Sequence, residues 1–295
     1  MEIVLHLGAH LTDEDRLVRC LMHNRARLGL LGVRVPSTSR YRQPLRQLAH
    51  DLRDTPITPE TQEMVLDSIL DEDDVRRVIL SSEYFLGVHR WAIINNRFYP
   101  SAGERVAQLR RLFPQAQVSV FLAIRDPAGF VPALVADARS GGAEAVLKET
   151  DPALLRWSEM LAGILQAAPD VPITVWSDED TPLLWPQILR RICGIEDGDA
   201  GGPELDGWLD WYADLVTPQG LGAMRRWFAQ HPPADAATLR RILTAMLQKF
   251  ARAEAMDSEV VLDGWTDDTT EALSLLYDQD LDVIASMRGV TLLEP

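Results

Sequence analysis

The sequence predicts an α/β fold in three layers, in which a mostly parallel central sheet is flanked by helices. Short runs of β-branched and aliphatic residues alternate four times with longer segments of helical periodicity. This alternation makes a parallel sheet covered by helices the economical architecture. We find no internal repeat that would suggest a different organisation. The predicted strands are residues 3–7, 75–80, 118–124 and 171–176.

The first strand opens into a loop that contains glycine. Residues 3–7 read as a short buried strand, Gly8 permits a tight turn, and Thr12 is a good N-cap for the following helix. A strand, a glycine loop and a helix N-terminus form a geometry in which backbone amides can bind a phosphate. The side chains that fill this loop therefore decide which function we expect.

The remaining helices follow from apolar periodicity and capping residues. Thr58 can cap a helix that begins at Pro59, because proline suits the first helical position. Residues 195–207 are predicted to form a mobile loop. Residues 208–256 are interpreted as a helical insert or subdomain within a single domain of residues 1–295, where they cover the sheet, form a lid or provide a dimer face. Further helices are predicted at 60–70, 99–113, 127–139, 154–167, 183–193 and 266–287.

The formal net charge of -15 is the most unusual bulk property of the chain. It argues against nucleic acid and anionic glycans as partners, because both are bound by basic clusters. Cys20 and Cys193 are too few for a disulfide framework and suit a reducing cytoplasm, which is the location we expect. The sequence shows no signal peptide, no apolar run of membrane-spanning length and no Cys/His spacing typical of zinc, so we expect no membrane contact and no metal.

Polar residues follow the second predicted strand. Ser81, Ser82 and Glu83 come directly after residues 75–80, and open α/β sheets bind ligands outside the carboxyl ends of their strands. Glu83 is therefore a candidate general base that would take a proton from an acceptor hydroxyl. The alternative is that Glu83 caps a helix or makes a structural hydrogen bond.

Arginines supply the candidate anion ligands. Arg125 follows the clearest central strand, and a guanidinium at the carboxyl edge of a sheet can hold a phosphate or a carboxylate bidentately. The alternative is a salt bridge from Arg125 to the acidic run 13–15. Arg40, Arg42 and Arg46 form a local basic patch, which is either a docking surface for an acidic substrate or a solvated helix face.

The order of these motifs resembles that of the P-loop sulfotransferase superfamily. Bacterial members begin with a strand, His-x-Gly-x-His-Lys-Thr-Gly, a run of hydroxyl residues and a helix. That opening is matched at His6, Gly8, His10 and Thr12. The family's Arg-x-Pro motif is matched at residues 125–127 and its Ser-x-Glu motif at residues 81–83. The resemblance extends over nearly the whole chain, but its motifs are thinly spread.

The resemblance implies a P-loop fold and the sulfuryl donor 3′-phosphoadenosine 5′-phosphosulfate. It implies that Arg125 contacts the 3′-phosphate of this donor and that Glu83 points into the active cleft. It also implies that a nucleotide or another anion is bound at Gly8, His10, Thr12, Ser81 and Arg125.

The departures from the family pattern lie where negative charge is stabilised. The family's lysine falls at Leu11, its Gly-Ser/Thr-Thr run at residues 13–15, and its serine after Arg-x-Pro at Ala133. Three carboxylates at a helix start can accept from the free amides themselves, and they repel a phosphosulfate. Residues 195–207 also lack the basic residue with which the family completes donor binding.

We therefore expect a sulfotransferase-like protein that has lost donor binding and uses no cofactor. It would act as a non-catalytic scaffold for a small molecule or a protein, with a homodimer through the helical insert as one form of assembly. The alternative is an active sulfotransferase that moves a sulfuryl group from the nucleotide donor to a hydroxyl acceptor, with Glu83 as base and Arg125 on the 3′-phosphate. Another enzyme in the same cleft is a third hypothesis.

Overall fold

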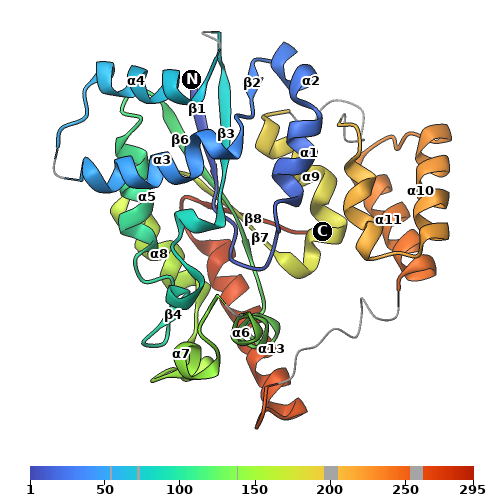
Figure 1. The fold of residues 1–295 in the computed structure, drawn as a ribbon. Coiled ribbons are helices and arrows are strands. Elements are labelled where there is room, and N and C mark those ends of the chain that lie inside the picture. The colour runs from blue at the N-terminus through green and yellow to red at the C-terminus, as the bar shows by residue number, and fades with distance from the viewer. Residues whose placement is uncertain (54, 72–73, 138, 196–204, 253–261) are drawn as a thin grey trace.

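The chain folds around a six-stranded sheet in which all neighbouring strands are parallel (Figure 1). This computed structural model describes residues 1–53, 55–71, 74–137, 139–195, 205–252 and 262–295. The strand order is β2-β3-β1-β6-β7-β8. The strands are β1 Glu2–His6, β2 Val33–Arg34, β3 Arg77–Ser81, β6 Gln117–Ile124, β7 Ile173–Ser177 and β8 Val290–Leu293. The predicted α/β fold with a mostly parallel sheet is confirmed.

The helices lie close to the predicted segments. They are α1 Arg16–His23, α2 Arg25–Leu30, α3 Thr38–Asp51, α4 Pro59–Ile69, α5 Ala102–Arg111, α6 Pro127–Ala136, α7 Ala143–Leu147, α8 Trp157–Ala167, α9 Thr181–Cys193, α10 Pro218–Gln230, α11 Ala236–Phe250 and α13 Asp267–Ser286. Thr58 caps α4 as predicted, because its hydroxyl accepts from the Thr61 amide at 3.3 Å. Within the described ranges, no helix is both long and apolar enough to cross a bilayer.

Short elements connect the strands. Two 3₁₀ turns, η1 Glu83–Phe85 and η2 His89–Trp91, follow β3, and a small antiparallel hairpin of β4 Ile93–Ile94 and β5 Arg97–Phe98 comes next. Longer 3₁₀ structure, η5, covers Trp208–Asp214.

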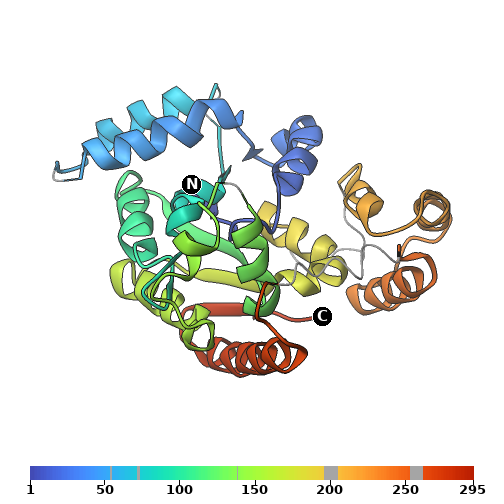
Figure 2. The same ribbon diagram turned by 60° about the horizontal axis from the view of Figure 1, so that its bottom comes forward.

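Helices cover both faces of the sheet, which gives the three predicted layers (Figure 2). Ile3 and Leu5 of β1 join a core with α3, α4, α5, α6, α8 and α13. Val4, between them, joins a second core with α1, α2, α9, α10 and α11. All three side chains are fully buried, and their alternation is the two-residue period of a strand that is covered on both sides.

The connections of the sheet diverge at β1 and β6. The chain leaves β1 toward β2 and β3, and it leaves β6 toward β7 and β8 on the other side. Ligands of open α/β sheets bind outside the carboxyl ends of the strands at such a point. The loop at residues 7–15 lies here, since the Leu7 and Ala9 amides donate to the Phe121 and Ala123 carbonyls of β6 at 2.9 and 3.1 Å.

The prediction that Thr12 caps the first helix is wrong. The Thr12 hydroxyl donates to the Ala9 carbonyl at 2.8 Å, and α1 begins only at Arg16. The helix starts late because Leu11, Glu14 and Asp15 have positive φ angles of 64°, 48° and 65°, which a right-handed helix does not allow. The predicted start was therefore several residues too early.

The helical block between α9 and α13 packs beside α9 (Figure 1). Tyr212, Met224 and Leu243 are fully buried in the second core. The large apolar side chains that are exposed, such as Leu30 and Leu275, lie outside the described part of this block. Its apolar residues therefore pack inward. Residues 253–256 of the predicted insert and 196–204 of the predicted mobile loop lie outside the described residues.

Candidate functional site

A cavity of about 320 Å³ opens at the carboxyl ends of β1 and β3. Three of the predicted site residues, Gly8, Ser81 and Glu83, line this cavity together. Arg42, which belongs to the basic patch noted in the sequence, also lines it, as does Arg139, which the sequence analysis did not single out. Polar residues that follow two strand ends thus meet at one cavity, while its arginines come from elsewhere in the chain.

Arg42 of α3 links the loop after β1 to the end of β3. Its Nη1 and Nη2 atoms donate to the Asp15 carboxylate at 3.0 and 2.5 Å, and its Nε donates to the Ser81 carbonyl at 2.8 Å. The hydrogen bonds from Arg42 hold the pKa of Asp15 below its usual range. One of the two interpretations of the basic patch was a solvated helix face. Arg42 does not fit it, because its guanidinium is bonded to Asp15 and to the Ser81 carbonyl.

Arg125 supports the loop instead of pairing with its acids. Its Nη1 donates to the Leu11 carbonyl at 3.4 Å, and its own carbonyl accepts from the Trp157 indole at 2.9 Å. In the described part of the chain, no ion pair joins Arg125 to residues 13–15, so the alternative of a salt bridge to these acids is wrong. Arg42 neutralises the loop in its place because Arg42 reaches Asp15 from α3.

Carboxylates of the protein accept hydrogen bonds from the backbone amides at two helix N-termini near the loop. Asp13 accepts from the Leu17 amide of α1 at 2.8 Å. Glu179 accepts from the Asp126 amide just before α6 at 3.0 Å, and Asp126 accepts from the Ala128 amide at 2.8 Å. Free amides at helix N-termini are the groups that bind phosphate in P-loop sites. Here the chain satisfies these three donors internally.

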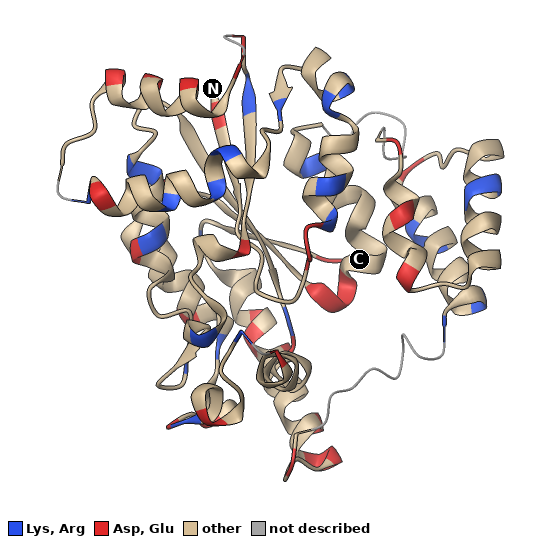
Figure 3. Cartoon of the chain, viewed as in Figure 1, with Lys and Arg blue, Asp and Glu red and all other residues tan. Residues whose placement is uncertain are grey.

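Two of the nearby carboxyl groups hold protons more tightly than usual. Burial raises the pKa of Asp13 to about 7, with Asp15 adding to the rise. Burial also raises the pKa of Asp178, which precedes α9, to about 7, with Glu179 adding to the rise. Figure 3 shows the acidic loop after β1 beside the acidic turn that opens α9. The two segments therefore concentrate acidic residues at the carboxyl ends of the strands.

Replacing Asp178 with asparagine should stabilise the protein at pH 8 and have little effect at pH 4. The folded pKa of about 7 exceeds the unfolded value of 3.8, so the carboxyl stabilises the fold below the unfolded pKa, and this contribution is lost as pH rises through 7. Asparagine cannot ionise, so the variant avoids this loss. The raised pKa corresponds to roughly 4 kcal/mol, and we expect about 2 kcal/mol because Asp178 is only partly buried and solvent screens its charge.

Urea denaturation of both proteins at pH 4 and pH 8 measures this difference. At each pH, the free energy of unfolding of the wild type is subtracted from that of the variant. This removes the effect of His6 and His10, whose pKa values burial lowers to about 4 and about 3, so that they make the fold more stable as the pH rises. Equal differences at the two pH values would contradict the assignment of the raised pKa to Asp178.

Glu83 lies at the cavity wall in a setting that suits a proton acceptor. It is partly buried, and burial raises its pKa, while Arg139 opposes the rise. Its Oε1 lies 3.5 Å from Nη1 of Arg139 and 3.8 Å from Nε2 of His89. Glu83 does not cap η1, but it accepts a hydrogen bond from Arg139, as the other alternative, a structural hydrogen bond, required.

His10 points away from the loop surface and into the protein. It is fully buried, its Nδ1 lies 2.7 Å from the Tyr99 hydroxyl, and its ring centroid lies 3.9 Å from that of His89. This contact could not be predicted from the sequence, because His89 and Tyr99 lie far from His10 along the chain, in or beside short irregular elements. His10 therefore belongs to the wall behind the cavity, whereas the resemblance implied a loop residue on a nucleotide.

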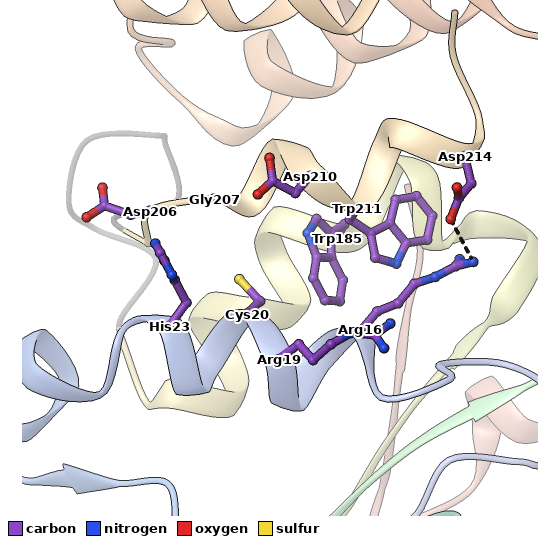
Figure 4. A pocket seen from close by; sticks show the side chains of 10 residues that line it. All are labelled: Arg16, Arg19, Cys20, His23, Trp185, Asp206, Gly207, Asp210, Trp211 and Asp214. Carbon is purple, nitrogen blue, oxygen red and sulfur yellow. Dashed lines mark hydrogen bonds and ion pairs between the residues drawn. The ribbon is translucent and has the colours of Figure 1, made fainter. Parts of the chain in front are cut away.

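A second cavity of about 320 Å³ lies between α1 and η5 (Figure 4). Trp185 and Trp211 stack there with centroids 5.5 Å apart, and Arg16 pairs with Asp214 at 3.3 Å. Burial raises the pKa of Cys20 to about 12, so its thiol stays protonated at neutral pH. The cavity offers an aromatic wall and paired charges rather than a nucleophile.

No family model matches the chain, and no curated protein matches it either.

Proposed function

We propose that this chain is a sulfotransferase-like protein that has lost donor binding and acts as a non-catalytic binding or assembly scaffold. The observation that carries the proposal is that amides at helix N-termini already donate hydrogen bonds to the carboxylates of Asp13, Asp126 and Glu179. A phosphosulfate would need such amides free. It would also have to displace carboxylates that already hold them.

The charges around the loop support the same conclusion. Leu11 occupies the position at which the resembling family has a lysine, and the cavity beside it is lined by residues 13–15 and Glu83 as well as by Arg42 and Arg139. Arg42 is already paired with Asp15. Transfer of an anionic group depends on preorganised donors and cations aimed at the developing charge. This cavity directs several carboxylates toward that place.

Isothermal titration of the full chain with adenosine 3′,5′-bisphosphate tests the proposal. We expect no saturable heat, with an established sulfotransferase as the positive control for the nucleotide. Micromolar binding that disappears in the Arg125→Ala variant would overturn the proposal and favour the active sulfotransferase. Size-exclusion chromatography with light scattering tests the homodimer as one form of assembly.

One observation favours the active sulfotransferase as the second candidate. Glu83 lines the cavity with a raised pKa, which is a property of general bases. This candidate requires the donor to bind, so the same titration separates the two functions.

A further inference from the structure

We propose that His10, Glu83 and His89 form a binding site for a divalent transition-metal ion, with Zn²⁺ as the ion that best fits these ligands. One ring nitrogen of each histidine and one carboxylate oxygen of Glu83 lie within 4.8 Å of one another. Two imidazoles with one carboxylate is a ligand set of zinc enzymes and of non-haem iron sites. The site does not depend on whether the cleft binds a nucleotide.

The strongest support is a pair of buried nitrogens without partners. His10 and His89 are 0% and 1% exposed, and the Nε2 atoms of both make no hydrogen bond. Burial lowers the pKa of His10, and the nearby Gly87 carbonyl only opposes this shift without forming a hydrogen bond with Nε2. Buried polar atoms are usually paired, and a bare one costs free energy. A cation between the two rings would satisfy both.

The surroundings of His10 suit a metal ligand. Its Nδ1 lies 2.7 Å from the Tyr99 hydroxyl, which also accepts from the His10 amide at 3.0 Å. Histidines that bind metals usually donate their second ring N–H to a fixed acceptor, which sets the tautomer. Metal binding at Nε2 selects the tautomer in which Nδ1–H donates to Tyr99. Tyr99 is itself only 2% exposed, so packing keeps its hydroxyl beside His10.

The carboxylate and the cavity complete the site. Glu83 supplies the negative charge, and its neighbour Arg139 is itself paired with Asp137 at 2.6 Å, so Arg139 is not committed to Glu83 alone. Glu83 and Tyr84 line the cavity at the ends of β1 and β3. An ion held by Glu83 therefore lies at the cavity wall, where water or a ligand group can take a further coordination position.

Calorimetric titration of the chelator-treated full chain with Zn²⁺ tests this site. We expect one saturable site in the wild type, and affinity at least about 100-fold weaker in His10→Ala and His89→Ala. Glu83→Gln, which changes a residue at the cavity wall, should weaken binding without affecting the buried rings. Exposed His231 provides the matched control, and His231→Ala should bind Zn²⁺ as the wild type does.

A second measurement separates ligation from folding. Co²⁺ bound at the same site should show the visible absorption bands of a four- or five-coordinate ion with nitrogen and oxygen ligands. The Tyr99→Phe variant should bind the metal about 10- to 100-fold more weakly, while its far-ultraviolet circular dichroism spectrum stays that of the wild type. Absence of saturable binding in the wild type overturns the proposal. Equal affinity in the wild type and in the His10→Ala/His89→Ala double variant overturns it as well.

Discussion

Replacing Asp280 with alanine should lower the free energy of unfolding by about 4 kcal/mol. Asp280 lies on α13, is 3% exposed, and accepts from the Trp157 and Ser158 amides at 2.7 and 3.1 Å and from the Ser158 hydroxyl. These amides begin α8, whose own N-cap residue, Arg156, makes no side-chain cap. Alanine leaves buried donors at a helix N-terminus without an acceptor and removes a charge that favours that end of the helix.

Chemical denaturation of the variant and of Asp278→Ala measures this effect. Asp278 lies on the same helix but is exposed, so its replacement should change the stability by no more than about 0.5 kcal/mol. Asp280→Asn keeps an acceptor oxygen and should fall between the two. A loss for Asp280→Ala as small as that for Asp278→Ala would show that α8 does not depend on this contact.

Replacing Gly103 with alanine should cost about 3 kcal/mol. Gly103 of α5 faces the backbone of α8, and a Cβ there would lie 2.4 Å from the Gly163 carbonyl oxygen and 3.3 Å from the Ala167 Cβ. The first contact is with backbone, which cannot move aside as a flexible side chain can. The two helices would therefore have to separate over a well-packed core.

The matched control is Gly163→Ala in the facing helix. A Cβ at Gly163 meets no atom within 4 Å, so alanine should be neutral or stabilise α8 by up to about 1 kcal/mol through its higher helix propensity. Thermal denaturation of both variants distinguishes a close helix crossing from a general intolerance of alanine. Similar transition temperatures for the two variants would rule out the close crossing.

The elements that carry their own pattern could be predicted from the sequence. The apolar runs at residues 118–124 and 171–176 became β6 and β7, and Thr58 with Pro59 marked the start of α4. These features depend on neighbours along the chain. β8 escaped prediction because Val290–Leu293 is a run of four residues that becomes a strand by pairing with β7.

The candidate site could be predicted only where it follows the strand ends. Gly8, Ser81 and Glu83 follow directly from the ends of β1 and β3 in a parallel sheet. The contact of Arg42 with Asp15 depends on how α3 packs against the sheet, and the approach of His89 to His10 depends on irregular turns. No local spacing records either contact. We expected no metal because the sequence shows no Cys/His spacing typical of zinc. A site built from residues far apart in the chain, such as His10 and His89, leaves no such spacing.

The position of β8 affects how the protein folds during synthesis. Residues 173–177 reach the ribosome exit well before residues 290–293, so the outer edge of β7 lacks its partner in the interval. An unpaired strand edge can recruit other chains, and emerging domains are most exposed to aggregation at this stage. The edge of β7 is therefore covered only after α13 has emerged, and the same helix supplies the Asp280 carboxylate that caps α8.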